Sequence, residues 1–296
     1  MLPTRDGVGP SVITLPVGDW LLIIDFLVQR FGAIPREEWL TRMQNKLVMD
    51  ENGLSVYPDR PYQPHLKIFY YRSIENEIPI PFEESILFQD EYLIIADKPH
   101  FLPVMPAGIY LQETLLVRLK RKTGIETLVP MHRIDRETGG LVVFVIKPET
   151  RGAYQSLFLS KQVEKCYQAI APYRNDLAFP VTYKSRLQES KNFMQMEEVE
   201  GEANSETIIE VLEQRDNLAR YQLKPVTGKK HQLRAHMAAL GIPILNDLIY
   251  PVHKAGDQDD FKNPLQLLAQ RIDFADPMTG EQRTFESKQE LNWSDS

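Results

Sequence analysis

The chain has 296 residues, of which 43% are hydrophobic, and its formal net charge is −7. This length exceeds one typical domain, so we expect a large core together with a small accessory domain. No apolar run reaches the roughly 18–20 residues of a membrane span, and no signal peptide is recognisable. A single cysteine excludes an internal disulfide. These features predict a soluble, cytoplasmic monomer without a membrane partner, and the acidic charge argues against nonspecific coating of nucleic acid.

Residues 1–80 predict a small α/β module. Eight Lys and Arg residues face ten Asp and Glu residues in this region, so it has no strong electrostatic preference for RNA. Pro79 and Pro81 interrupt regular structure and predict a linker behind it. The pattern predicts helices over Trp20–Phe31 and Arg36–Asn45, and strands over Lys46–Met49 and Leu66–Tyr71 around the Asn52-Gly53 turn.

Residues 85–290 predict a second domain in which strands dominate. Segments rich in β-branched and aromatic residues predict strands over Tyr92–Ala96, Leu141–Ile146, Val163–Ile170, Val181–Leu187, Thr207–Leu212 and Ala219–Leu223. Helices are expected over Glu113–Lys122, Glu149–Leu159 and Lys229–Leu240. Because strands and helices do not alternate regularly, the fold class is α+β, with a mixed, largely antiparallel central sheet and flanking helices. The acidic stretches Glu197–Glu202 and Asp257–Asp260 predict solvated loops.

The segment Met131–Leu141 has the composition of a reaction site. His132, Arg133 and Arg136 surround one carboxylate, Asp135, and two glycines follow it. Such crowding of one acid by bases is typical of functional sites, and glycines allow a ligand or another backbone to approach closely. Taken alone, a motif this short also occurs by chance.

A second segment, Val163–Ala169, predicts a strand with one polar-aromatic face. The period of two places Lys165 and Tyr167 on one face and Cys166 on the other. Without further context, this pattern most often describes a half-exposed strand whose cysteine fills the core.

A third segment, Pro225–His236, combines a glycine turn with a helix that we expect to begin at Lys229. Free N–H groups at a helix start, next to Lys229 and Lys230, predict a phosphate-binding site. Leu233, Met237 and Leu240 form the expected buried stripe, which leaves Arg234 at the margin of the core. A solvated helix start is the ordinary alternative.

Together these segments, in this order, resemble the RluA-type pseudouridine synthases. His132–Phe144 matches the family's HRLDxxTSGLLLF motif, Lys165–Ala169 its KxYxA motif and Thr227–His236 its TGRxHQLRxH motif. Upstream, 96–99 resembles the NKP motif, and downstream, 240–250 resembles LGxPIxGDxxYG while 267–277 resembles LHAxxLxFxHP. The departures are Ile134 for Leu, Gly139 for Ser, Lys229 for Arg, Asn246 for Gly and Leu268 for His.

The resemblance implies isomerisation of uridine to pseudouridine in a structured RNA, either 23S ribosomal RNA or transfer RNA, without cofactor or metal. Asp135 would be the nucleophile or base, kept ionised and oriented by Arg234. Tyr167 would stack on the flipped target base and take part in proton removal. Arg133 would fill the gap that the base leaves, unless it forms a structural ion pair. RNA contacts are expected from His132, Lys165, Lys229, Lys230 and His231.

Other classes of protein compete with this interpretation. The sequence has neither the glycine-rich loop nor the Asp-Phe-Gly motif of a protein kinase. A metallohydrolase on His132, His231 and His236 would lack a recognised ligand spacing. A noncatalytic RNA-binding relative stays open. So does the role of residues 1–80, which follow the order of a small alpha-L RNA-binding module but match it poorly, and which equally suit docking or structure.

Overall fold

The computed structural model describes the whole chain except residues 1–3, 75–76, 191–194, 254–260 and 294–296. It divides by its contacts into two compact units. The first unit contains residues 1–78, 106–112 and 117–126, and the second contains residues 79–105, 113–116 and 127–296. In the described residues no helix is long and apolar enough to cross a membrane.

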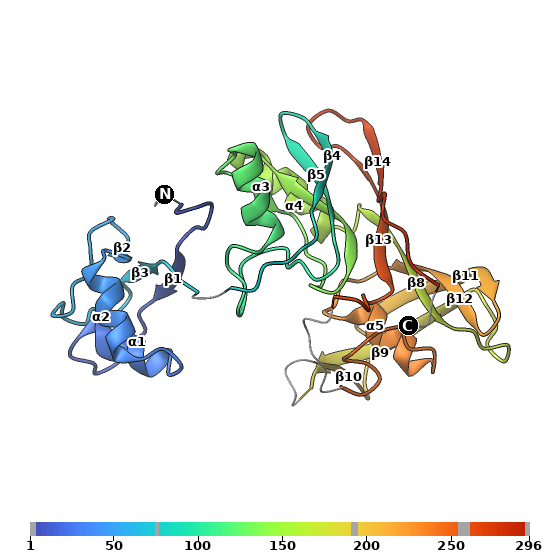
Figure 1. Cartoon of the computed structure of the whole chain (residues 1–296), viewed down its shortest axis with the longest axis horizontal. Coiled ribbons are helices and arrows are strands. Elements are labelled where there is room, and N and C mark those ends of the chain that lie inside the picture. Colours follow the sequence, from blue (N-terminus) through green and yellow to red (C-terminus); the bar gives the residue numbers. More distant parts are fainter. Residues whose placement is uncertain (1–3, 75–76, 191–194, 254–260, 294–296) are drawn as a thin grey trace. The chain divides into compact units, whose positions relative to one another are not determined.

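The N-terminal part of the first unit is built on a small antiparallel sheet with two helices (Figure 1). Its described strands lie in the order β1-β3-β2, and its core is centred on Trp39, which is fully buried. Its elements are β1 (Ser11–Thr14), α1 (Ile23–Arg30), α2 (Arg36–Gln44), β2 (Val48–Asp50) and β3 (Lys67–Tyr70). Both expected helices and both expected strands are therefore present. The helix expected from Trp20 begins three residues later, and β1 was not expected.

The second unit is built on one long sheet, with the described strands in the order β10-β9-β11-β12-β8-β13-β7-β5-β4. In addition, β14 pairs with β13 and β6 with β7. The strands are β4 (Ser85–Gln89), β5 (Leu93–Lys98), β6 (Val129–Pro130), β7 (Gly139–Val145), β8 (Glu164–Pro172), β9 (Val181–Glu189), β10 (Met196–Val199), β11 (Ser205–Arg215), β12 (Leu218–Pro225), β13 (Leu267–Ala275) and β14 (Gln282–Glu286).

Among the strand pairs in the described residues, only β13 with β7 is parallel. The expected α+β class with a mixed, largely antiparallel sheet is thus confirmed. Strands β4, β6, β10, β13 and β14 were not expected. The interpretation of Glu197–Glu202 as a loop is wrong in part, because Met196–Val199 pairs with β9 at the edge of the sheet. The stretch Asp257–Asp260 lies outside the described residues.

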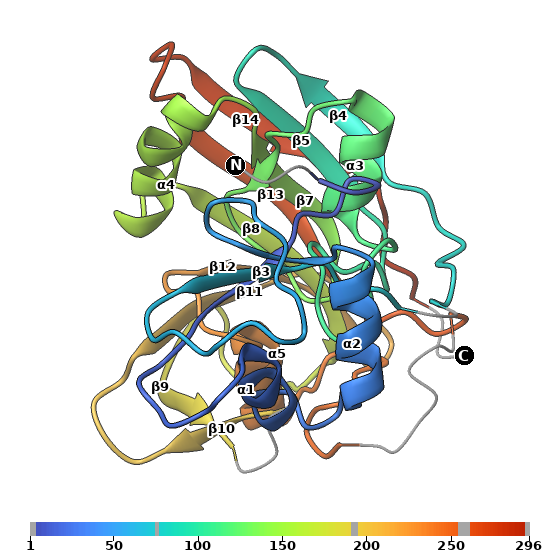
Figure 2. The same cartoon turned by 90° about the vertical axis from the view of Figure 1, so that its left-hand side faces the viewer.

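Two helices of the second unit pack at opposite ends of its sheet (Figures 1 and 2). The described helices after α2 are α3 (Leu115–Thr123), most of which belongs to the first unit, α4 (Arg151–Leu159) after the short helix η1 (Pro148–Thr150), and α5 (Gln232–Ala239). One apolar cluster joins α4 to β5, β7 and β13, and another joins α5 to β8, β11 and β12. Val163, which precedes β8, belongs to the first cluster, and Ala169 on β8 belongs to the second, against which Tyr167 also packs.

The glycine pair after Asp135 is explained by the parallel strand. Gly140 has a φ of +107°, and a Cβ atom there would overlap the backbone of Ala269 on β13. At Gly139 a Cβ atom would lie 2.7 Å from Nε2 of His100. The close approach expected from these glycines is therefore made by another backbone, and it fixes β7 beside β13.

Candidate active site

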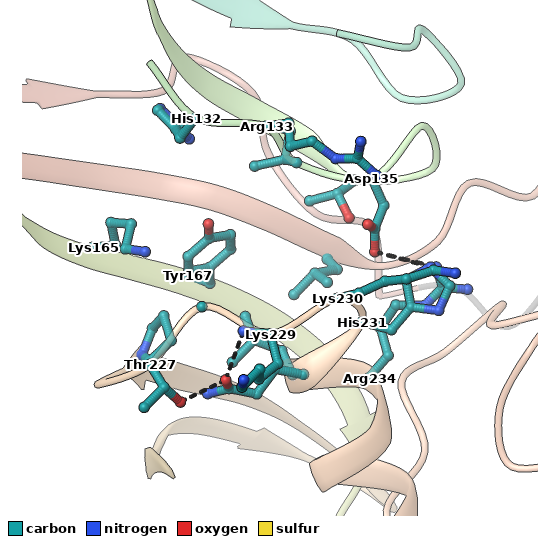
Figure 3. Close-up of a pocket in the computed structure, with 17 residues that line it drawn as sticks. His132, Arg133, Asp135, Lys165, Tyr167, Thr227, Lys229, Lys230, His231 and Arg234 are labelled. Carbon is teal, nitrogen blue, oxygen red and sulfur yellow. Dashed lines mark hydrogen bonds and ion pairs between the residues drawn. The ribbon is translucent and has the colours of Figure 1, made fainter. Parts of the chain in front are cut away.

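A cavity of about 390 Å³ in the second unit contains all nine of the site residues that the sequence predicts (Figure 3). In Figure 3 the His132–Asp135 segment lies on one side, the loop from Thr227 to Lys229 on the other, and Tyr167 between them. The cavity is lined by His132, Arg133, Ile134, Asp135, Thr138, Lys165, Tyr167, Pro225, Thr227, Gly228, Lys229, Lys230, His231, Gln232, Leu233, Arg234 and Leu267.

The loop that carries Asp135 is held by hydrogen bonds from its own Thr138 and from Lys98, the last residue of β5. The N–H of Thr138 donates to the carbonyl of Asp135 over 3.1 Å, which closes a turn. Lys98 is fully buried, and its ammonium donates to the carbonyls of Pro99 and Arg136 over 3.0 and 3.1 Å. Burial lowers the pKa of Lys98 to about 7, although the Glu137 and Asp135 carboxylates oppose that shift. The position of Asp135 therefore depends on buried hydrogen bonds.

Arg234 is held in a fork by a second carboxylate, Asp247. Its Nε and one terminal nitrogen donate to the two oxygens of Asp247 over 2.8 and 2.7 Å, and both side chains are 1% exposed. The other terminal nitrogen lies 3.4 Å from an Asp135 oxygen and 3.7 Å from a Glu137 oxygen. Burial alone would lower the pKa of Arg234, but the hydrogen bonds and charge of Asp247 hold it above its ordinary value. The guanidinium is thus a fixed cation beside Asp135.

The expectation that Arg234 lies at the margin of the core was wrong. Helix α5 buries every residue from Gln232 to Met237, so Arg234 is inside the fold. Asp247 makes this possible, because a guanidinium can be buried when a carboxylate is paired with it. Asp247 also accepts the backbone N–H groups of Ile249 and Tyr250 over 2.8 and 3.0 Å, which fixes its own orientation.

His231 and Tyr250 complete the environment of Asp135. Nε2 of His231 lies 3.8 Å from an Asp135 oxygen, and Nδ1 lies 3.3 Å from the Tyr250 hydroxyl. Burial lowers the pKa of His231 despite the neighbouring Asp135 charge. The Tyr250 ring also lies 5.6 Å from the Arg234 guanidinium carbon. Asp135 itself remains 25% exposed, so a ligand in the cavity can reach it.

Tyr167 and Lys165 project into the cavity from β8, on the polar-aromatic face that the strand period predicts. Tyr167 is paired in register with Leu223 on β12 and with Ala269 on β13, so its backbone is fixed on both sides. Burial, followed by the Asp135 charge, raises the pKa of the Tyr167 hydroxyl. Burial also lowers the pKa of Lys165. The ring is a rigid flat surface beside the carboxylate.

The loop before α5 differs from the expected helix start. The helix begins at Gln232, and His231 precedes it with a left-handed φ of 52°, so Lys229 and Lys230 lie in the loop. Gln232 organises this loop, because its Oε1 accepts the Thr227 hydroxyl over 2.6 Å and the Lys229 N–H over 3.1 Å. The expectation that the helix begins at Lys229 is therefore wrong. Phosphate binding by this loop stays a prediction, and both lysines line the cavity.

His132 is tied to the sheet. The N–H of Val143 donates to its Nε2 over 3.2 Å, and its ring stacks on Phe158 at 5.1 Å between centroids. Burial lowers the pKa of His132 to about 3, so the ring is neutral at pH 7. Its contact with RNA stays a prediction, and any such contact would be made by a neutral ring.

Arg133 lines the cavity with an exposed side chain. Within the described part of the chain it forms no ion pair, which weighs against the structural alternative. Over the same residues, no group of three or more His, Cys, Asp and Glu side chains is arranged to hold a metal ion.

No role was predicted for Lys98, Asp247, Tyr250 and Gln232, although each lies in a recognised motif. All four act through backbone or side-chain partners that are distant in the sequence. Lys98, for example, contacts Arg136, which is 38 positions away. Only their polar character inside otherwise apolar segments marked them as unusual.

The cavity brings together a carboxylate that can react with a ligand and a fixed cation that stabilises the charge of this carboxylate. Asp135 can act as nucleophile or base, Arg234 as the cation and Tyr167 as a stacking surface. Arg133, Lys165, Lys229 and Lys230 add positive charge at the walls, which suits a polyanionic ligand.

The fold is the pseudouridine synthase fold. The human RNA pseudouridylate synthase domain containing 1 matches 70% of this chain and 84% of its own, with a TM-score of 0.58 and 22% identity. The human RNA pseudouridylate synthase domain containing 4 matches 70% of this chain and 88% of its own, with a TM-score of 0.53 and 25% identity.

Sequence comparisons define the family. The model of the RNA pseudouridylate synthase family matches residues 92–239. The dual-specificity RNA pseudouridine synthase RluA of Haemophilus influenzae is 32% identical, over 74% of this chain and 99% of its own length. The tRNA pseudouridine(31) synthase of Saccharomyces cerevisiae is 27% identical, over 80% of this chain and 69% of its own. The chain therefore belongs to the RluA family of RNA pseudouridine synthases, isomerases that modify RNA.

Proposed function

We propose that this enzyme isomerises specific uridines in transfer RNA or 23S ribosomal RNA, with Asp135 as the catalytic carboxylate on a flipped-out base. The reaction replaces the bond from ribose C1′ to uracil N1 by a bond from C1′ to C5. The uracil then loses a proton from C5 and carries one on N1. Reactant and product have the same atoms, so the balance needs no cofactor and no metal.

The observation that carries this proposal is the position of Asp135. Its carboxylate lies 3.4 Å from a buried guanidinium that makes two hydrogen bonds to Asp247, and it remains accessible from the cavity. Arg234 favours the charged carboxylate and restricts its orientation. Both properties are needed by a group that attacks the nucleotide or removes a proton from it.

Tyr167 and Arg133 are proposed to hold the reacting base out of its stack. The rigid ring of Tyr167 offers a stacking surface beside Asp135, and the exposed Arg133 can take the place of the extruded uracil. Extrusion costs a few kcal/mol. Contacts of Lys165, Lys229, Lys230 and His231 with the RNA backbone would offset this cost.

Substituting Phe for Tyr167 separates stacking from proton removal. Tyr167→Phe retains the ring, so RNA affinity should stay within about twofold of the wild type. It removes the hydroxyl, so the single-turnover rate should fall at least about 100-fold. Fluorescence anisotropy and quantification of pseudouridine measure the two effects. Equal loss of affinity and rate would contradict the role.

The relatives' names support transfer RNA as one substrate class. They include the yeast tRNA pseudouridine(31) synthase and the tRNA pseudouridine synthase C of Vibrio parahaemolyticus, which is 28% identical over 72% of this chain. The acidic net charge fits recognition of one structured RNA by a local basic cavity, because charges on the protein surface are screened beyond roughly 8 Å.

We propose that residues 1–80 form an N-terminal module and that residues 85–290 form the catalytic domain. We also propose that the protein acts as a monomer. Arg36, Arg42 and Lys46 are the basic residues with which the module would touch RNA. Arg42 is 5% exposed and Arg36 forms an ion pair with Asp25 over 2.8 Å, so a docking or structural role has equal support.

The test is a pseudouridine map of transfer and ribosomal RNA from cells with and without this protein. We expect one or a few positions to lose pseudouridine without it and to regain it when the purified enzyme is added. An unchanged map, together with no product in vitro, would overturn the enzymatic proposal and leave an RNA-binding protein without activity.

A further inference from the structure

A second and larger cavity continues from the catalytic one. It has a volume of about 840 Å³, within the range of ligand-binding pockets. Both cavities lie in the second unit. The two cavities share the lining residues His132, Lys165, Pro225, Thr227 and Gly228.

The walls of the second cavity are net positive. Four cationic side chains line it against two carboxylates, those of Glu164 and Asp273. Lys224 is 47% exposed, and its ammonium lies 3.7 Å from Glu210. Arg271 has the same exposure and pairs with Asp273 over 2.7 Å. The remaining cations are those of Lys161 and Lys165. Half-exposed cations around a hollow suit a phosphodiester, which can compete for their hydrogen bonds.

One wall of this cavity is apolar and aromatic. Leu159 is 76% exposed and Val226 is 38% exposed. Phe158 stands next to them, with its ring stacked on His132 at an interplanar angle of 21°. An aromatic ring beside cations is the combination that binds unpaired nucleotides, because every base has a face that stacks.

The junction of the two cavities limits what can fill both. Lys165 and His132 line both hollows, and in Figure 3 they lie at the end of the catalytic cavity away from Arg234 and His231. A ligand that extends from beside Tyr167 past Lys165 must be continuous through this junction. A polynucleotide strand has that form, since a phosphate links each nucleotide to the next.

We propose that the second cavity binds the nucleotide next to the target uridine on the same RNA strand, unpaired, with its base against Phe158 and the linking phosphate at Lys165. This inference rests on the proposed function, since it places the target uridine beside Asp135 and Tyr167. Lys224 contacts the far phosphate of the flanking nucleotide. The enzyme therefore needs at least two unpaired nucleotides in its RNA, and its affinity depends on the presence of the second.

The first test uses the RNA site found by the pseudouridine map and three variants of the full chain. Phe158→Ala and Lys224→Gln should each raise the half-saturating RNA concentration about fivefold or more. The single-turnover rate at saturation should be unchanged. Lys184→Gln is the matched control, because Lys184 is 56% exposed, lies 3.3 Å from Glu206 and lines neither cavity. Its half-saturation should equal that of the wild type.

A substrate that lacks the flanking base sharpens this test. With RNA that is abasic at the neighbouring positions, one at a time, the wild type should lose affinity at one position, and Phe158→Ala should lose nothing further there. An additive loss at every position, or unchanged half-saturation in both cavity variants, would overturn the proposal. Lys224→Gln decides the outcome if Phe158→Ala lowers the thermal stability.

A second test does not depend on turnover. Cys166 is the chain's single cysteine, it lines the second cavity, and it does not line the catalytic one. Pentauridylate should slow modification of Cys166 by a thiol reagent at least about threefold at concentrations that saturate binding. Uridine monophosphate should not slow it. Equal modification rates with and without bound pentauridylate would overturn the subsite, whereas protection without any pseudouridine product would overturn only the proposed function.

Discussion

At the scale of single residues, Asp247 determines which guanidinium nitrogen of Arg234 is available to Asp135. Two hydrogen bonds of 2.7 and 2.8 Å use one edge of the guanidinium, which leaves the remaining nitrogen for Asp135. A side chain with a single point charge would not combine these contacts, because only the planar fork of arginine presents donors in both directions. We therefore regard Asp247 as a residue that positions Arg234 and through it Asp135.

Asp247→Asn should lower the single-turnover rate about 100-fold, because the released guanidinium no longer fixes Asp135. The half-saturating RNA concentration should change little. Asp50→Asn is the control, since Asp50 is 1% exposed, pairs with Arg60 over 2.8 Å and does not line the cavity. Both variants should unfold at lower urea concentrations, but only Asp247→Asn should slow product formation. Equal rates for the two variants would make Asp247 merely structural.

Residue types and their order were sufficient to predict nine of the seventeen residues that line the cavity, because each of the nine lies in a short motif. Their partners were not predictable, because Lys98 and Asp247 act over long sequence separations. Some departures from the family pattern have local reasons. Asn246, which replaces a glycine, has a φ of 62°, a conformation that asparagine tolerates. His100 lies where a serine side chain at position 139 would lie, because a Cβ atom there would be 2.7 Å from its Nε2.

At the scale of elements, the site depends on the parallel pairing of β7 with β13. This pairing places the Asp135 loop beside the strands that carry Tyr167, since β13 is also paired with β8. The contact between backbones at Gly140 leaves no space for a side chain. The catalytic loop and the stacking ring are thus connected by one strand.

Gly140→Ala should destabilise the fold by about 2–4 kcal/mol, through a strained φ and an overlap with Ala269. Gly152→Ala, in helix α4, should be neutral or stabilising by up to about 1 kcal/mol, because no atom lies within 4 Å of the added Cβ. Urea unfolding measures both changes. A Gly140→Ala protein as stable as the wild type would show that the two strands can separate locally without cost.

Elements with a strong local period were predictable, and those that depend on distant partners were not. The expected strands from Tyr92 to Leu223 were all found, with ends shifted by a few residues. The edge strand β10 was missed because its residues do not alternate: two adjacent glutamates follow Met196, the one buried side chain of the strand. The start of α5 was predicted too early, because the Gln232 side chain accepts a hydrogen bond from the Thr227 hydroxyl and holds the preceding loop near Thr227. Helical periodicity does not reveal this contact.

At the scale of the whole molecule, charge is distributed locally. The chain carries −7 overall, yet the two neighbouring cavities are lined with an excess of cations. Binding of RNA should therefore weaken steeply with salt, as it does for proteins that contact several phosphates. The net charge alone would have excluded the correct class.

Stability should fall as the pH falls below about 6.5, the ordinary pKa of histidine. His236 is fully buried, and burial lowers its pKa to about 4. Its neutral ring therefore contributes stability above pH 6.5. That contribution is lost as the pH falls toward 4, because the unfolded chain binds a proton that the fold excludes. The loss reaches up to about 2 kcal/mol between pH 6.5 and 5.

Urea unfolding of the wild type and of His236→Asn at pH 7.5, 6 and 5 measures this effect. The variant starts from lower stability, because Ser205 and Thr207 lose their partner in the ring, which lies 2.9 Å from each hydroxyl. Its stability should nevertheless decline less with falling pH. Parallel declines in the two proteins would show that His236 is charged in the folded state.

The catalytic assignment of Asp135 is tested most directly by measuring pseudouridine formation and RNA binding with the same preparation of Asp135→Asn. We expect no detectable product from this variant. Its RNA affinity should lie within about threefold of the wild type, and its unfolding midpoint should be similar, because Asp135 is partly exposed and Arg234 remains paired with Asp247. Turnover near the wild-type rate would contradict the assignment of Asp135 as the catalytic carboxylate.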